Sequence, residues 1–393
     1  MKLVMLKNQT IYLLFGLLLV LIYLILGSGL HGDDYVVISN FRSSNFGDFI
    51  TINVEKIMKF NIATYYSFWF FYFSLGEEHQ WVYDSIKIVS HAISFFLVYK
   101  FSTDYLPKDR AVLVSLIFIL YPLHDTTAYW YMTAPYILIP STILYAHHLI
   151  RNNNIRLGVF ISILGAFSYY LSPPYIFGLA TIFLFEKQFK KAIIFITPGF
   201  LYVVYYFWIK FNYADVERRI NSDLGILDFL KQIIIQPLSF LESALGPSYW
   251  LKIFYAIESI SLFSVIIVAV ISIFSFIKVK KFSKVPALPK SLLVGLISVL
   301  ILSFGMYALT GLYSHSAFNL GNRSTIYGSL LIAFLLVTFL PANKKSVIFL
   351  LIIFLAPIFG LSDHWKSWNI HQKIVIENIK NNQELKAIEI DST

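Results

Sequence analysis

The stretch that decides the fold runs from residue 11 to residue 40 and reads "IYLLFGLLLVLIYLILGSGLHGDDYVVISN". Its first part, residues 11–29, is an almost unbroken apolar run, long enough for a helix that crosses a bilayer. The run is longer than the core of a signal peptide, and no small-residue cleavage site follows it. We therefore expect an uncleaved first membrane span that ends beside two adjacent carboxylates, Asp33 and Asp34.

The composition of the whole chain is typical of a protein that crosses the membrane many times. Of its 393 residues, 58% are hydrophobic and only 13% are charged, about half the charged fraction of a soluble domain. The mean hydropathy is +0.69, and an aromatic content of 18% suits helix ends anchored at the bilayer surface. Cysteine is absent, which excludes disulfides, thiolate metal sites and a cysteine nucleophile.

The apolar pattern predicts an all-α polytopic membrane protein with about eleven transmembrane helices in a single domain over residues 1–393. The expected spans cover residues 11–29, 82–101, 111–123, 133–150, 157–172, 174–186, 192–209, 252–277, 291–310, 325–340 and 345–361. The remaining long segments are expected outside the cytoplasm: a first outer loop with juxtamembrane helices at 30–81, an amphipathic loop at 210–251, and a tail at 362–393.

Basic residues concentrate in short loops on one side of this topology. The clearest cases are "KQFKK" at 187–191 and "KVKKFSKVPALPK" at 278–290, and such loops mark the cytoplasmic side. We therefore expect an integral protein of a bacterial cytoplasmic (inner) membrane, with its N-terminus in the cytoplasm and its C-terminus outside. The net charge of +9 then reflects orientation and contact with membrane lipids, and it predicts no nucleic-acid partner.

Two groups of polar residues follow apolar runs on the expected outer side. In the first, Asp33 and Asp34 beside Tyr35 are either an acidic helix start or a site where a partly desolvated carboxylate acts as a base. In the second, "YPLHDTTAYWY" at 121–131, His124 and Asp125 are either part of a turn with an aromatic belt or a titratable pair at the membrane edge.

A third outer group and one intramembrane group complete the candidates. Arg323 in "GLYSHSAFNLGNRSTIYG", residues 311–328, lies near His315 and either binds a lipid-linked phosphate or reaches to lipid headgroups. On the second expected span, Asp84, Lys87 and His91 share one helix face. They predict a buried ion pair, which we favour, or the inner wall of the site.

Four of these stretches together resemble a known family, the GT-C membrane glycosyltransferases. "GDDYVVISN" (32–40) resembles the opening of that family, and "WVYDSIKIVSHAISFFLVY" (81–99) resembles its second span with an internal His. "LIFILYPLHDTTAYWYMTA" (116–134) is similar to a stretch of the tetratricopeptide-linked mannosyltransferase branch, although Thr126 stands where that branch has Glu. "GNRSTIYG" (321–328) resembles the Arg-containing entry to a late span.

The resemblance implies a GT-C-like core at 1–210 with a catalytic first outer loop, followed by variable helices at 252–361. It implies an inverting glycosyltransferase that moves a sugar from a polyprenyl-phosphate donor to a glycan, lipid or protein acceptor on the outer (periplasmic) face. Asp33 or Asp34 would be the base. A divalent cation, Mg²⁺ or Mn²⁺, would fit at His124 and Asp125. The substrate-binding residues would be Tyr35, His91, His124, Asp125, His315 and Arg323. The competing functions are a transporter or flippase, and a polymerase or ligase, for lipid-linked saccharides.

Overall fold

The computed structural model describes residues 16–39, 76–212, 224–278, 283–284, 287–311, 315–341 and 343–382. Every regular element within these ranges is a helix, which confirms the all-α prediction. Most of the expected first outer loop (residues 40–75), part of the second (213–223) and the final residues of the expected tail (383–393) lie outside the described residues.

The helices fall into an N-terminal and a C-terminal series. The first contains Gly16–Ile25, α2 (Asp33–Ser39), η2 (Glu77–His79), α5 (Gln80–Ser102), α6 (Lys108–Ile119), η3 (Pro122–His124), α7 (Asp125–Tyr129), η4 (Tyr131–Thr133), α8 (Pro135–Arg151), α9 (Ile155–Ala166), α10 (Ser172–Phe185) and α11 (Phe189–Asn212). The second contains α12 (Ile226–Leu245), α13 (Pro247–Glu258), α14 (Leu262–Lys278), α15 (Lys290–Thr310), η5 (Asn319–Thr325), α16 (Ile326–Phe339) and α17 (Lys344–Asn381).

The described helices are consistent with an integral membrane protein, but with fewer established spans than the sequence predicts. Five helices are long and apolar enough to cross a membrane, or up to seven if each of two bent helix pairs is a single span. The predicted eleven are not confirmed, because several expected spans are short helices. For example, α9 has 12 residues and α10 has 14, whereas a straight crossing needs about 20.

Two expected segments differ in the structure. The span predicted over 252–277 falls on two helices, α13 and α14, and the stretch Ile226–Glu258, which ends with α13, meets α14 at a bend of 106°. The backbone N–H of Ser261, at this break, donates to Asp363 Oδ2 at 2.8 Å, so a carboxylate from α17 stabilises the start of α14. The tail predicted from residue 362 continues the preceding helix instead, since α17 runs unbroken over 38 residues to Asn381.

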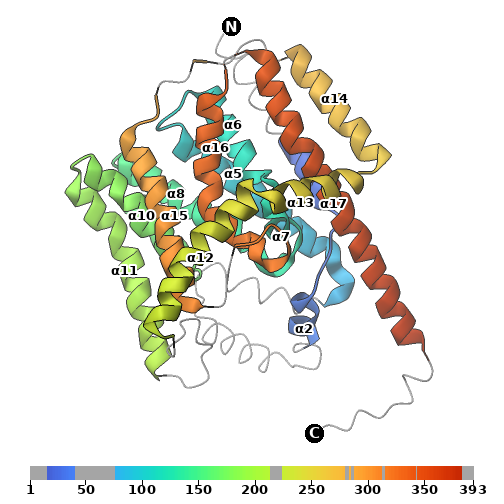
Figure 1. Ribbon diagram of the computed structural model, residues 1–393, viewed down its shortest axis with the longest axis horizontal. Coiled ribbons are helices and arrows are strands. Elements are labelled where there is room, and N and C mark those ends of the chain that lie inside the picture. Colours follow the sequence, from blue (N-terminus) through green and yellow to red (C-terminus); the bar gives the residue numbers. More distant parts are fainter. Residues whose placement is uncertain are drawn as a thin grey trace.

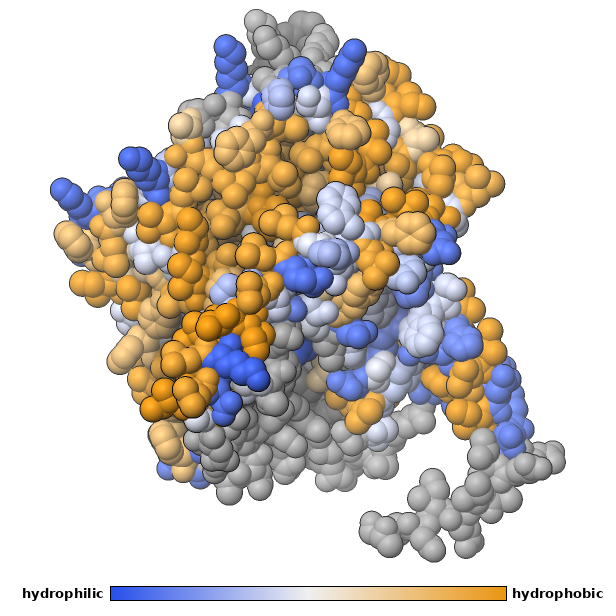
Figure 2. Space-filling model, viewed as in Figure 1, coloured by the Kyte–Doolittle hydropathy of each residue, from blue (hydrophilic) through white to orange (hydrophobic). Residues whose placement is uncertain are grey.

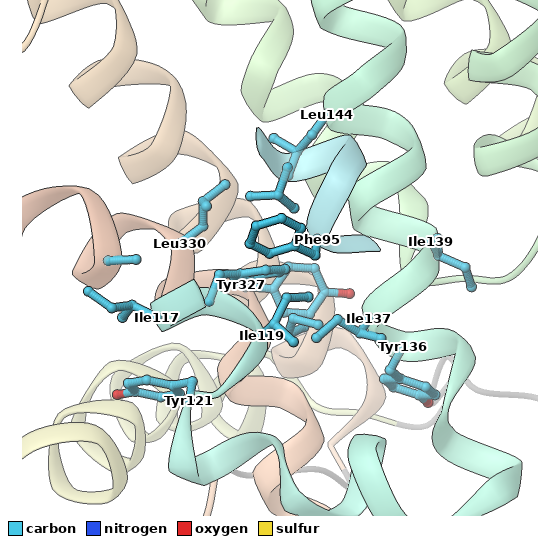
Figure 3. Close-up of a cluster of buried hydrophobic side chains, with 14 of the residues drawn as sticks. Phe95, Ile117, Ile119, Tyr121, Tyr136, Ile137, Ile139, Leu144, Tyr327 and Leu330 are labelled. Carbon is cyan, nitrogen blue, oxygen red and sulfur yellow. The ribbon is translucent and has the colours of Figure 1, made fainter. Parts of the chain in front are cut away.

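The central core is formed by α5, α6, α8 and α16. Figure 3 shows Phe95, Ile117, Leu144 and Leu330 among the buried side chains that these four helices contribute. Glycines let neighbouring helices approach closely: a Cβ on Gly178 of α10 would lie 2.5 Å from the backbone nitrogen of Val299 on α15. Since bilayer lipid offers no hydrophobic drive between helices, such close packing holds the helices together.

The polar features lie at one end of this helical assembly (Figure 1). There α7 lies beside α17 close to where α13 crosses it, and α2 lies further along α17. At the other end α14 finishes at Lys278 and α15 begins at Lys290, so these two helix ends lie opposite α2. Which end faces the cytoplasm stays a prediction. Figure 2 shows mostly hydrophobic side chains over α11, α14 and α15, and a gathering of hydrophilic side chains near the crossing of α13 and α17.

Candidate functional site

A pocket with a volume of about 660 Å³ opens where α7, α13 and α17 meet. Charged and aromatic side chains dominate its lining, in contrast to the apolar helix surfaces around it. The lining residues are Asp125, Thr126, Trp130, Lys252, Tyr255, Ala256, Ser259, Phe318, Asn319, Leu361, His364, Trp365 and Trp368. Concave sites that combine apolar walls with a few polar groups are where small molecules bind.

The floor of the pocket is an ion pair between Asp125 and Lys252. Lys252 Nζ lies 2.6 Å from Asp125 Oδ1, and both side chains are nearly inaccessible to solvent. Asn322 also donates to Asp125 Oδ1, and Trp365 Nε1 donates to Oδ2 at 3.2 Å. Lys252 Nζ donates further to the carbonyl of Ala317 at 2.6 Å, which leaves one of its three N–H groups for a ligand.

Three indole rings form the walls. Trp130 follows α7 directly, while Trp365 and Trp368 lie on α17 beyond the residues expected to cross the membrane. Trp368 is 49% exposed, so its ring is available to a ligand in the pocket. Flat aromatic faces bind apolar C–H surfaces, and the polar atoms of the floor bind hydroxyl or phosphate oxygens. This combination suits a sugar or a sugar phosphate.

The acidic pair of α2 lies next to this pocket, and its two members have different environments. Asp34 is fully buried, and its carboxylate accepts backbone N–H groups from His31 at 3.0 Å and from Met132 at 3.1 Å. Met132 lies two residues after the wall residue Trp130. Asp33 is exposed to solvent. Asp34 therefore fastens α2 to the pocket wall, while Asp33 remains accessible.

Burial raises the pKa of Asp34 to about 7, although the two backbone donors favour the ionised form. Because this pKa lies above its unfolded value, Asp34 contributes most stability below about pH 4 and loses that contribution as the pH rises towards 7. We expect the melting temperature of the wild type minus that of Asp34→Ala to decrease as the pH rises from about 4 to about 7. Thermal unfolding in detergent at a series of pH values measures it, and a constant difference would contradict it.

A second buried ion pair holds the loop before α2. Asp84 Oδ2 accepts the backbone N–H of Gly27 at 2.7 Å, and Oδ1 accepts that of Gly29 at 3.0 Å. Lys87 Nζ lies 2.9 Å from Asp84 and donates to the carbonyls of Gly29 and Tyr129. Because Tyr129 is the last residue of α7, this pair ties the loop to the segment that carries Asp125 and Trp130.

Close backbone packing at Gly32 completes the junction. Its φ of +49° is rarely adopted by other residues, and a Cβ there would lie 2.9 Å from the ring of Trp130. A glycine therefore allows the start of α2 to touch the indole wall directly.

The three predicted histidines do not line this pocket. His91 is buried in α5, where its Nδ1 lies 2.8 Å from the carbonyl of Lys87, and His124 packs its ring against Phe118 and Tyr121. His315 is buried against Phe240 and within 2.9 Å of the hydroxyl of Ser324, and burial lowers its pKa to about 3. These rings are parts of the packed interior, and the roles predicted for them in substrate binding gain no geometric support.

Tyr35 and Arg323 lie outside the pocket but near it. Tyr35 accepts a hydrogen bond from Gln80 Nε2 at 3.2 Å and lines a neighbouring pocket beside α17. The guanidinium of Arg323 lies 5.2 Å from the ring centre of Tyr136. Arg323 belongs to η5, the segment that also supplies Asn319 to the pocket lining and Asn322 to Asp125.

The predicted cation ligands are arranged differently from a metal site. In the part of the chain that the structure describes, His, Asp and Glu side chains do not gather in threes around a common point. Asp125 instead has Lys252 as its positive partner, and the His124 ring points into an aromatic cluster with Phe118 and Tyr121. The divalent cation stays a prediction without a defined set of ligands.

The sequence-based reasoning missed Lys252, Trp365 and Trp368. Lys252 stands at the start of an apolar run, and an ionisable residue at that position is itself a signal for function. The two tryptophans fall in a segment that we expected to be a tail. Comparison of the chain with family models, with curated proteins and with solved structures found no match.

Proposed function

We propose that the protein is a membrane glycosyltransferase that moves a sugar from a polyprenyl-phosphate donor to a glycan, lipid or protein acceptor, with inversion, on the outer face of a bacterial cytoplasmic membrane. The observation that carries the proposal is the indole-walled pocket with Asp125 and Lys252 at its floor. Stacking surfaces and a desolvated cation in one cavity suit a ligand that is part sugar and part phosphate.

The roles follow from accessibility and charge. Lys252 keeps one N–H for the donor phosphate, and Asp125 holds Lys252 in place. Asp33, the exposed member of the acidic pair, takes the proton from the acceptor hydroxyl as its oxygen attacks the anomeric carbon. The bond from that carbon to the phosphate oxygen breaks, and polyprenyl phosphate leaves as a stable anion that needs no general acid. Asp34 is a positioning residue, because it is buried and fixed by backbone donors.

An apolar pocket elsewhere supports a donor with a hydrocarbon chain. It has a volume of about 520 Å³ and lies among α10, α11, α12 and α15. Tyr170, one of its lining residues, shares a 2.9 Å hydroxyl contact with Tyr136, over whose ring Arg323 lies. Tyr136 and Tyr170 therefore connect Arg323 to one edge of this pocket, where its guanidinium would attract a lipid-linked phosphate.

The test uses the purified protein in detergent with a polyprenyl-phosphate sugar that carries a radiolabel in the sugar. We expect release of polyprenyl phosphate with transfer of the label. Detergent solution has no compartments, so a transporter or flippase would leave the donor intact there and would act only in sealed vesicles. A polymerase or ligase would instead require a donor that already carries an oligosaccharide. Either of those results would replace the proposal.

The substitution Lys252→Met is expected to weaken donor binding. Loss of a hydrogen bond from a charged group costs about 1.5 to 3 kcal/mol, which corresponds to a donor KM roughly 10- to 100-fold higher. The matched control is Lys231→Met, an exposed lysine of α12 that does not line the pocket. Steady-state kinetics with varied donor measure the effect. A donor KM equal to that of the control would remove Lys252 from the site.

A further inference from the structure

Resting on the proposed function, we propose that the acceptor is an elongated neutral saccharide and that it binds in a second pocket, between α2 and the C-terminal half of α17. This pocket has a volume of about 650 Å³. Its lining residues are Gly32, Tyr35, Glu77, Trp368, His371, Gln372, Val375, Ile376, Ile379 and Lys380. Trp368 also lines the pocket that contains Asp125, so the two cavities adjoin at one indole ring.

A single stripe of α17 forms the wall of both cavities. The lining residues of this helix recur at intervals of three and four from Leu361 to Ile379, which places them on one helix face. Within this stripe, the residues up to Trp368 face the first pocket and those from Trp368 onward face the second. A ligand that follows the stripe passes from the donor sugar along α17, and this favours an extended acceptor over a compact one.

The shared indole is fixed to the start of α2. The side-chain amide of Gln372 lies 3.0 Å from His31 Nδ1, and in the orientation that donates to this nitrogen its oxygen accepts from Trp368 Nε1 at 3.3 Å. His31 is suited to accept, because burial keeps its ring neutral by lowering its pKa to about 3. Through Gln372, Trp368 is therefore held beside His31, which precedes Asp33, the proposed base, by two residues.

The chemistry of the second pocket suits hydroxyls rather than a second phosphate. Lys380 Nζ lies 2.6 Å from Glu77 Oε1, so the only cation of the lining already has a carboxylate partner within the described residues. The hydroxyl of Tyr35 and the ring of His371 offer hydrogen-bonding groups. Val375 and Ile379 supply apolar surface for the C–H faces of sugar rings. An uncharged saccharide satisfies both kinds of surface, whereas an anionic ligand would lack a free cation.

The test fills the second pocket and leaves the first intact. The variants are Val375→Trp and Ile379→Trp, which change exposed lining residues, and the matched control is Ile374→Trp, because Ile374 is 50% exposed on the same helix but does not line the pocket. The probes are neutral oligosaccharides from a monosaccharide to a tetrasaccharide, with a labelled polyprenyl-phosphate sugar as donor. Release of polyprenyl phosphate without acceptor reports donor turnover on its own.

We expect the wild-type acceptor KM to fall as the oligosaccharide lengthens. In the two pocket variants it should rise about tenfold or more and lose its dependence on length, while acceptor-free donor turnover matches that of Ile374→Trp. Equal acceptor KM values in pocket and control variants would overturn the acceptor site and leave the glycosyltransferase standing. Donor turnover without transfer to any oligosaccharide would overturn the saccharide class. If the wild type never releases polyprenyl phosphate, both proposals fall.

Discussion

Replacing Lys87 with methionine is expected to lower the free energy of unfolding by about 3 to 5 kcal/mol. The ammonium of Lys87 is fully buried and is the ion-pair partner of Asp84, which is also buried. Removing it leaves a carboxylate without a counterion in a low-dielectric interior, and it deletes the donors to Gly29 and Tyr129. Thermal and denaturant unfolding in detergent, followed by circular dichroism, measure the loss.

The double variant Asp84→Asn with Lys87→Met is the control for this mechanism. It removes the buried Asp84 carboxylate charge together with the Lys87 ammonium, so part of the stability lost in the single variant should return. If Lys87→Met is as stable as the wild type, the ion pair is not what holds the loop before α2. The same conclusion follows if the double variant loses as much stability as the two single variants lose in sum.

Asp33→Asn is expected to reduce kcat for sugar transfer by about 10²- to 10⁴-fold, the usual contribution of a general base. The donor KM should change little, because Asp33 is not among the residues that line the donor pocket. The melting temperature should also hold, since the Asp33 side chain is exposed. Steady-state kinetics with varied donor and acceptor measure these quantities.

Glu78→Gln is the matched control, because Glu78 is another exposed acid near the same end of the molecule and lines neither of the two proposed substrate pockets. It should keep wild-type kcat. If Asp33→Asn also keeps wild-type kcat, Asp33 is not the base.

The sequence predicted where polar groups collect better than it predicted how they are arranged. The motif with Asp125 was recognisable because a carboxylate at the end of an apolar run is costly and therefore suggestive. Its partners were not recognisable, since Lys252 and Trp365 lie 127 and 240 residues away along the chain. Lys252 comes from α13, ahead of the sharp bend into α14, and Trp365 comes from the long continuation of α17.

The acidic pair shows a similar limit at short range. Neighbouring residues on a helix point about 100° apart, so one of two adjacent acids can be buried while the other stays in water. The sequence "DDY" does not say which, and the choice depends on the loop that Gly27, Gly29 and Asp84 build before α2. The roles predicted for the histidines stay predictions, and packing against aromatic rings places His124 and His315 in the interior.

The central claim is that this protein cleaves a polyprenyl-phosphate sugar and transfers the sugar by means of the acidic pair on α2. The most direct measurement is acceptor-dependent transfer of label by purified protein in detergent, for the wild type and for the double variant Asp33→Asn with Asp34→Asn. The account predicts transfer by the wild type and none above background by a double variant that remains folded. Transfer at the wild-type rate by the folded double variant would contradict it.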